Sequence, residues 1–305
     1  MKIAIVGIGG IGGFVGGALL KQGADVAMIA RGVNLAAIRE NGLTVESVLL
    51  GEFTVRPPMI TDNPEEVGVV DAVIFSTKGQ QLEQACRQAA PMIGPDTLVV
   101  PLLNGIEVSS QMEPFLPPCD LADGCIRVFS HIAQPGLIRQ TAGKCQLPMG
   151  KKDGSKSEKL EELVHLLCEA GLQARMAEDI RVECWSKYLL MGGNSVAFCH
   201  FDGPAGVVLE RDPELNFLRQ TYGELVAVAT ALGVTLPEGL AERCVEEFAK
   251  HSYDTISSLY RDVSSGKDPL DTELLHIIGR MVDLGKQCGV PTPCHSGVLE
   301  QLLPK

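Results

Sequence analysis

The sequence predicts an α/β protein with a parallel sheet in its N-terminal part and an all-helical C-terminal part. Two observations support this class. Short apolar runs alternate with helical patterns over the first half of the chain, and only helical periodicity remains after about residue 179. We therefore predict two domains, residues 1–178 and residues 179–305.

The first thirty residues predict a strand, a turn, a helix and a second strand. Lys2–Val6 is apolar almost throughout, as expected for a strand buried on both faces. The glycine-rich residues 7–12 form the turn, residues 14–22 can form a helix that Gly23 ends, and residues 25–30 form the next apolar run. This is a βαβ unit.

The remaining elements follow from the same periodicities. In the first domain we expect helices at 35–41, 82–90 and 155–170, strands at 71–76, 97–103, 120–149 and 172–176, and a hairpin at 43–55. Pro135-Gly136 marks a turn within 120–149. In the second domain we expect helices at 180–198, 212–232, 240–263 and 272–288, with breaks at Pro237 and Pro291.

Composition narrows the class of protein. Of the 305 residues, 45% are hydrophobic and 21% are charged, which excludes a mostly disordered chain. The net charge of −12 argues against nucleic acid or an anionic membrane as a partner. No apolar run is long enough for a membrane span and no cleavage site follows the N-terminal run, so we expect a cytoplasmic protein. The ten cysteines form no C-x-x-C pair, and no metal site is predicted.

The glycine turn has the pattern of a dinucleotide site. Gly7-Ile8-Gly9-Gly10-Ile11-Gly12 stands between a strand and a helix, the context that gives G-x-G-x-x-G its meaning. Gly7 permits the tight turn, Gly9 lets the backbone approach a pyrophosphate, and Gly12 allows close packing of helix on strand. The alternative is a glycine turn without a ligand. With the ligand, the first domain is a Rossmann domain.

The end of the second strand favours NADPH over NADH. An acidic residue there holds the ribose 2′-hydroxyl of NAD, whereas an arginine favours the 2′-phosphate of NADP. This chain has Arg31 and no acid at that point. A guanidinium forms charge-assisted hydrogen bonds to phosphate. The alternative for Arg31 is a solvated surface residue.

Short motifs along nearly the whole chain resemble the ketopantoate reductase (2-dehydropantoate 2-reductase) family. They are GIGGIGG at residues 7–13, Ala30-Arg31-Gly32, Ser76-Thr77-Lys78, Leu103-Asn104-Gly105, Trp185-Ser186-Lys187, Ser257-Ser258-Leu259-Tyr260-Arg261-Asp262 and Gly289-Val290-Pro291-Thr292-Pro293. The resemblance implies a Rossmann domain, a helical domain, an active site in the cleft between them, and NADPH-dependent reduction of a 2-keto acid.

The same resemblance implies roles for single residues. Lys187 matches the catalytic lysine, and Asn104 matches the asparagine beside both the nicotinamide and the substrate. Lys78 matches a lysine after the fourth strand of the cofactor domain, and Ser258 matches a serine that contacts the substrate carboxylate.

The catalytic acid of the family is harder to place. The resemblance places this acid between the Ser257–Asp262 motif and the motif that begins at Gly289. The family spacing counted back from Gly289 selects Glu273, whereas the spacing counted forward from Asp262 ends near Leu270 or Asp271. We prefer Glu273 and keep Asp271 as the alternative.

One departure from the family bears on the substrate. The family often has asparagines four and eight residues after the lysine, where this chain has Met191 and Ser195. Asn194 stands one residue away, and one residue rotates a helical side chain by about 100°. We include Asn194 and Ser195 as candidate substrate contacts. Because Met191 cannot bind a hydroxyl usefully, the pattern leaves the substrate open.

The residue chemistry agrees with a reductase. Hydride transfer to a ketone leaves negative charge on the carbonyl oxygen, which a lysine can stabilise and protonate. Lys187 lies in an apolar helical stretch, although a snorkelling surface lysine is the alternative. Three other candidates also have a purely structural alternative. Asn104 could be an ordinary turn residue, Glu273 a solvated residue early in a helix, and Ser258 a serine inside a helix that bonds to its own backbone. The six histidines show no pairing, and His276 is of interest because it lies one turn from Glu273.

The predicted function is NADPH-dependent reduction of a 2-keto acid, with 2-dehydropantoate to pantoate in pantothenate biosynthesis as the leading reaction. One alternative is the reduction of a different 2-keto acid by the same fold. The other is a non-catalytic NADPH-binding redox sensor. The apolar stripes of the helical half are predicted to form core or a homodimer surface.

Overall fold

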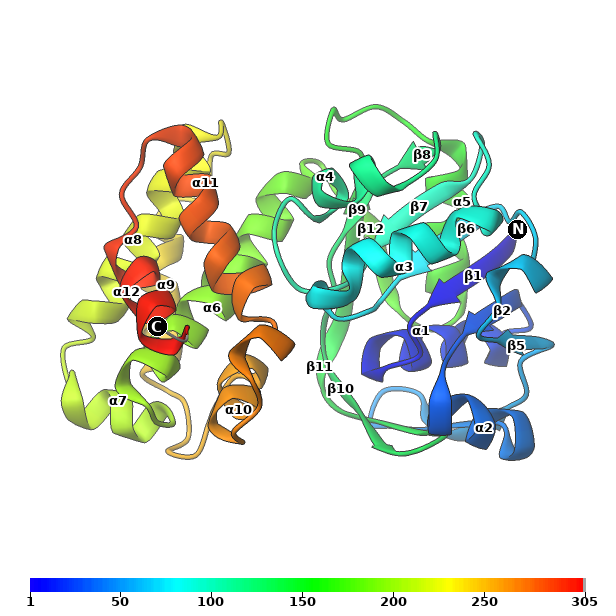
Figure 1. Ribbon diagram of the computed structural model, residues 1–305, viewed down its shortest axis with the longest axis horizontal. Coiled ribbons are helices and arrows are strands. Elements are labelled where there is room, and N and C mark those ends of the chain that lie inside the picture. Colours follow the sequence, from blue (N-terminus) through cyan, green and yellow to red (C-terminus); the bar gives the residue numbers. More distant parts are fainter. Residues whose placement is uncertain (304–305) are drawn as a thin grey trace. The chain divides into compact units, whose positions relative to one another are not determined.

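The predicted α/β class is confirmed by the computed structural model, which describes residues 1–303 (Figure 1). By its internal contacts the chain forms two compact units. The first consists of Met1–Leu103 and Glu107–Glu183, and the second consists of Asn104–Ile106 and the chain from Cys184 onward.

The first unit is built on the predicted parallel sheet. Its strands are β1 (Lys2–Val6), β2 (Asp25–Ile29), β5 (Met59–Thr61), β6 (Ala72–Phe75), β7 (Leu98–Pro101) and β8 (Asp120–Leu121), in the order β5-β2-β1-β6-β7-β8. Every neighbouring pair is parallel. The four central strands, β1, β2, β6 and β7, carry nearly continuous apolar runs, as strands covered on both faces require.

Helices cover both faces of this sheet (Figure 1). They are α1 (Gly10–Lys21), α2 (Gly32–Asn41), α3 (Leu82–Ala89), α4 (Val108–Met112) and α5 (Glu158–Glu169), with 3₁₀ turns η1 (Pro64–Glu66), η2 (Gly79–Gln81), η3 (Ala90–Met92) and η4 (Glu113–Phe115). Ile3 and Ile5 pack in the core that contains α1 and α5, whereas Ala4 and Val6 pack in the core that contains α3. Strand alternation thus divides the apolar side chains between two cores.

A second sheet in this unit is not predicted by the sequence. It has the order β10-β11-β3-β4, from β3 (Leu43–Ser47), β4 (Gly51–Val55), β10 (Arg127–Gln134) and β11 (Leu137–Gly150), and β9 (Asp123–Gly124) and β12 (Gln173–Met176) also pair with β11. The hairpins at 43–55 and at Pro135-Gly136 are as predicted. β11 joins them because it pairs with β10 and β3 along the same residues.

The second unit is helical, as predicted. Its elements are α6 (Ile180–Phe201, continuing from the first unit), α7 (Ala205–Arg211), α8 (Asn216–Ala231), α9 (Leu240–Phe248), α10 (Ser258–Ser264), the 3₁₀ turn η5 (Pro269–Asp271), a π-turn labelled η6 (Leu275–Gly279), α11 (Arg280–Cys288) and α12 (Pro293–Leu302). Helices α7 and α12 are absent from the prediction, because α7 is short and α12 follows the break at Pro291.

Two predicted helices are wrong in extent. The expected helix at 240–263 is two helices, because the main-chain oxygens of Tyr253 and Thr255 accept hydrogen bonds from the first turn of α7. Ser257 then caps a new helix by accepting from the Tyr260 amide. The expected helix at 272–288 contains the π-turn before α11.

Within residues 1–303, none of the helices combines the length and the apolar character that a membrane span needs.

Candidate active site

The glycine turn has the conformation that its sequence predicts. Gly7 has a φ of +94°, in the region that favours glycine, and directs the chain from β1 toward α1. A Cβ on Gly7 would lie 2.9 Å from the backbone nitrogen of Thr77. The Ser76 hydroxyl donates to the Gly7 carbonyl at 2.8 Å. The motif at residues 76–78 therefore lies against the turn and fixes its shape.

The helix after the turn begins earlier than predicted, at Gly10 instead of residue 14. Its first turn therefore consists of Gly10-Ile11-Gly12-Gly13, with Gly9 as the N-cap. A Cβ on Gly12 would lie 2.1 Å from the Gly7 carbonyl oxygen, whereas one on Gly9 meets nothing within 4 Å. Gly12 serves close packing, as predicted, and Gly9 leaves open space at the helix N-terminus.

The residues around this turn fit the pyrophosphate of a dinucleotide. The first N–H groups of a helix have no intrahelical partner and carry the positive end of its dipole. Thr77 adds a buried hydroxyl that has no hydrogen-bond partner among the described residues. Asn34 holds the loop by donating to the Ile8 carbonyl at 2.7 Å. Open space, unpaired donors and a fixed loop are what an anion at a helix N-terminus requires.

Arg31 and Lys78 are exposed, and they follow β2 and β6, the two strands on either side of β1. Arg31 stands two residues after the end of β2 and is the N-cap residue of α2, and its guanidinium donates to the side-chain oxygen of Gln88. Lys78 precedes the 3₁₀ turn η2. Both cations therefore stand after the carboxyl ends of strands that pair with β1 in parallel. Open α/β sheets bind their ligands at the carboxyl ends of the strands.

In the second unit, Lys187 and Asn104 are in direct contact. The Lys187 Nζ donates to Asn104 Oδ1 at 3.0 Å, and both side chains are half-buried. Since an ammonium only donates, the amide atom that faces it must be the oxygen. Buried aromatic residues fix α6 on both sides of the lysine, because Trp185 packs edge to face on Tyr188 and the Tyr188 hydroxyl donates to the Ile277 carbonyl.

His276 and Glu273 belong to the same group of side chains. The His276 Nε2 lies 2.6 Å from the main-chain oxygen of Asn104. Burial lowers the pKa of His276, the bond to Asn104 and the charge of Glu273 oppose that shift, and Arg280 adds to it. Glu273 is buried, whereas Asp271 is exposed. Burial near the histidine favours Glu273 over Asp271 as the acid of this group.

The other predicted substrate contacts have different surroundings. Asn194 is buried and its Oδ1 accepts from the Tyr222 hydroxyl at 2.5 Å, and the Ser195 hydroxyl donates to the Met191 carbonyl one turn back at 2.8 Å. These bonds stabilise helix packing and do not support contact with a substrate. Ser258 is exposed as the first residue of α10, and the capping hydroxyl is that of Ser257.

Sequence reasoning missed three residues that shape the two groups. Asn34 and Ser76 hold the glycine turn, and Tyr188 fixes α6 beside the lysine. Ser76 belongs to the Ser76-Thr77-Lys78 motif, which by itself predicts no contact with the turn. Its position after a strand was the one available signal, since its partner is 69 residues away in sequence.

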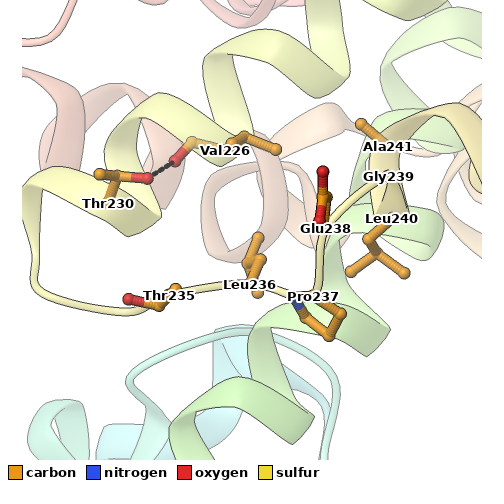
Figure 2. A pocket seen from close by; sticks show the side chains of 9 residues that line it. All are labelled: Val226, Thr230, Thr235, Leu236, Pro237, Glu238, Gly239, Leu240 and Ala241. Carbon is orange, nitrogen blue, oxygen red and sulfur yellow. Dashed lines mark hydrogen bonds between the residues drawn. The ribbon is translucent and has the colours of Figure 1, made fainter.

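A separate hollow of about 240 Å³ lies between the end of α8 and the start of α9 (Figure 2). Apolar side chains such as Val226, Leu236 and Leu240 line much of it. The Thr230 hydroxyl on its wall already donates to the Val226 carbonyl at 2.9 Å. The lining contains no predicted site residue. Over the described part of the chain, no group of three or more His, Cys, Asp or Glu residues is placed to hold a metal ion.

Comparison with known proteins gives matches over both halves of the chain. The family model described as "Ketopantoate reductase PanE/ApbA" matches residues 3–154, and "Ketopantoate reductase PanE/ApbA C terminal" matches residues 179–305. The 2-dehydropantoate 2-reductase of Mesorhizobium japonicum is 29% identical over 324 residues, which cover 98% of this chain and 96% of that protein.

Solved structures share the fold over the whole chain. The crystal structure of a PanE/ApbA family ketopantoate reductase from Ralstonia eutropha JMP134 has a TM-score of 0.87 and 26% identity, covering 99% of this chain and 97% of that one. D-mandelate dehydrogenase, in a ternary structure with NADH and anilino(oxo)acetate, has a TM-score of 0.85 and 24% identity, with coverage of 99% and 97%. The latter likeness concerns the fold alone.

Proposed function

The chain belongs to the ketopantoate reductase family of oxidoreductases, and on that premise we propose that it uses NADPH to reduce a 2-keto acid to the 2-hydroxy acid. The observation that carries the proposal is the contact of Lys187 with Asn104, in a chain whose other unit has the glycine turn and Arg31. The leading substrate is 2-dehydropantoate, which would be reduced to pantoate.

Lys187 has the chemistry that the reaction needs. NADPH, when bound, supplies the hydride that reaches the carbonyl carbon. The carbonyl oxygen then becomes negative, and a positioned ammonium stabilises that charge and gives the proton that completes the hydroxyl group. Asn104 accepts one Lys187 hydrogen and so orients the remaining N–H bonds of the amine.

The other residues bind and orient. The first-turn N–H groups of α1 and the Thr77 hydroxyl would hold the pyrophosphate, and Arg31 would bind the 2′-phosphate, as a guanidinium does through paired hydrogen bonds. Glu273, which is buried in the second unit, would offset the positive charge of the Lys187 ammonium. Ser258 would donate a hydrogen bond to the substrate carboxylate.

Met191 favours a second candidate, a 2-keto acid without a hydroxyl group. It lies four residues after Lys187 on α6, which is one helical turn along the same face. Its side chain is half-buried and offers only a thioether, a weak acceptor. A branched apolar keto acid suits this surface better than the hydroxylated chain of 2-dehydropantoate.

The test is a panel of 2-keto acids in which the rate of cofactor oxidation is measured for each substrate, with NADPH and with NADH in parallel. We expect turnover with 2-dehydropantoate or a branched 2-keto acid, and preference for NADPH. Comparison of 2-dehydropantoate with an analogue that lacks its hydroxyl separates the two candidates. Absence of turnover over the whole panel, despite bound NADPH, would refute the enzymatic proposal.

The residue-level prediction concerns Lys187. Lys187→Met should lower kcat by about 10²-fold or more, the range of a positioned general acid, and leave the Kd for NADPH within about twofold. Lys286→Met is the matched control, since Lys286 is an exposed lysine of α11 in the same unit. Equal turnover of the two variants would remove Lys187 from the reaction.

A further inference from the structure

His276 is tied to the main chain of the residue whose side chain holds Lys187. Its Nε2 lies 2.6 Å from the Asn104 carbonyl oxygen, and Asn104 Oδ1 lies 3.0 Å from Lys187 Nζ. A carbonyl oxygen only accepts, so the His276 Nε2 carries the hydrogen, and a neutral ring is the Nε2–H tautomer. Asn104 is therefore held at two points by two side chains.

Gly105 makes room for this contact. It has a φ of +121°, and a Cβ there would lie 2.4 Å from the His276 Nε2. Any other residue would push the imidazole off the carbonyl. The Asn104-Gly105 pair therefore does more than form a turn. Because Gly105 has no side chain, the imidazole of His276 can reach the main-chain oxygen of Asn104.

The π-turn η6 holds the histidine rigidly. The Arg280 amide donates to the Leu275 carbonyl five residues back, which makes this turn wider than an α-helical turn. The Tyr188 hydroxyl donates to the Ile277 carbonyl inside the turn, and Tyr188 follows Lys187 directly on α6. His276 is 8% exposed. A wide turn at this point is a feature that proteins place at functional sites.

We propose that His276 is a positioning residue for the reduction, a role that rests on the proposed function. By donating to the Asn104 carbonyl it keeps the Asn104 amide oxygen on Lys187, and so fixes the amine that delivers the proton. His276 itself transfers no proton.

The charges that face the ring agree with a neutral donor. Glu273 stands one turn before it, Arg280 one turn after it, and the Asn104 loop contacts it from outside the helix. The pKa of His276 is lowered, with burial as the largest cause. A neutral Nε2–H group donates at neutral pH without adding a positive charge close to the Lys187 ammonium.

The experiment compares His276→Gln with His276→Leu. A Gln amide nitrogen reaches about as far as Nε2 and keeps the donor, whereas Leu keeps bulk without a donor. We expect His276→Leu to lower kcat about 10- to 100-fold with KM changed less than about threefold, because small misplacements of a catalytic group cost that much. His276→Gln should stay within about fivefold of the wild type. The alkaline limb of the kcat profile should move to lower pH in His276→Leu alone, because the Asn104 amide oxygen no longer stabilises the Lys187 ammonium.

A cavity variant separates the hydrogen bond from folding. His276→Ala opens space beside Gly105, and added imidazole should restore turnover, whereas neutral 1-methylimidazole has no N–H to donate and should not. Equal rescue by both compounds, or a kcat loss that His276→Gln shares in full, would overturn the positioning role.

A measurement without substrate distinguishes failure of this inference from failure of the proposed function. Long-range ¹H–¹⁵N spectra of the wild type, with the signal assigned through His276→Gln, should show His276 as the Nε2–H tautomer between about pH 6 and pH 8. An Nδ1–H tautomer, or ordinary titration over that range, overturns the contact. Absence of turnover with the expected tautomer overturns the proposed function instead.

Discussion

Adding one methyl group at Gly12 should destabilise the first unit before any ligand is considered. The new Cβ would lie 2.1 Å from the Gly7 carbonyl oxygen and 2.2 Å from the Ser76 hydroxyl, whereas ordinary contacts begin at 3.4 Å. The hydroxyl can rotate away, but the carbonyl is backbone. Overpacking of this kind costs about 1 to 3 kcal/mol, and an obstacle of backbone puts Gly12→Ala at about 3 kcal/mol.

Gly9→Ala is the matched control, three residues earlier. A Cβ there meets nothing within 4 Å, and Gly9 has an extended conformation (φ −93°, ψ −160°) that alanine adopts freely. Replacing an N-cap glycine by alanine costs at most about 1 kcal/mol. If the pyrophosphate approaches the backbone at this point, the same methyl group weakens NADPH binding by about tenfold or more.

Thermal unfolding and NADPH titration measure the two effects separately. About 3 kcal/mol corresponds to a melting temperature about 6 to 12 °C lower for a unit of this size, and about 1 kcal/mol to at most about 4 °C. We expect the large shift in Gly12→Ala and the loss of affinity at a near-normal melting temperature in Gly9→Ala. A Gly12→Ala protein that melts like the wild type would refute the packing argument. A Gly9→Ala protein that binds NADPH normally would refute the placement of the phosphates.

Three further predictions concern single side chains. Arg31→Ala should weaken NADPH binding about 10-fold or more and leave NADH binding unchanged in fluorescence titrations, because a charge-assisted bond to phosphate contributes about 1.5 to 3 kcal/mol; equal losses for both cofactors would contradict this. Glu273→Gln should lower kcat/KM by about 10²-fold while Asp271→Asn stays near the wild type, and the reverse order would move the acid to Asp271. The lowered pKa of His276 means that the unfolded chain binds a proton first as the pH falls below about 6.5, so folding stability declines below that pH. Urea unfolding at several pH values should show a shallower decline in His276→Gln, and an unchanged slope would speak against a buried neutral ring.

The parallel sheet could be predicted because its pattern is local. Most of its strands, such as Lys2–Val6, are short apolar runs with a turn and a helix after them, and those signals lie within about thirty residues, whereas the three-residue strand β5 (Met59–Thr61) was not predicted. The second sheet could not be predicted, since β11 pairs with β3 about ninety residues earlier and with β12 about thirty residues later. Its polar and apolar residues also do not alternate cleanly. Pairing over such distances leaves no period in the sequence.

Helix extents in the second unit show a different limit. The segment between α9 and α10 has no strong breaker, and what opens it is a pair of backbone hydrogen bonds from α7, which lies about fifty residues earlier. The π-turn also gives no signal in the sequence. Its one extra residue shifts the helical periodicity of apolar residues only for the residues that follow the turn. Periodicity therefore gives the helical class, and packing decides where each helix ends.

The same distinction explains why Asn104 and Lys187 could be predicted as site residues, whereas the bonds that join Asn104 to Lys187 and to His276 could not. Asn104 was predicted from its resemblance to the asparagine of the Leu103-Asn104-Gly105 motif, a local signal, but its two bonds reach 83 and 172 residues along the chain. Those bonds also explain why Asn104–Ile106 belongs with the helical unit although Leu103 and Glu107 on either side belong to the other. The tripeptide Asn104–Ile106 therefore has its chain neighbours in one unit and its packing neighbours in the other. Its conformation depends on Gly105 and His276 together, so a family motif that records only the asparagine and its glycine omits half of what holds it.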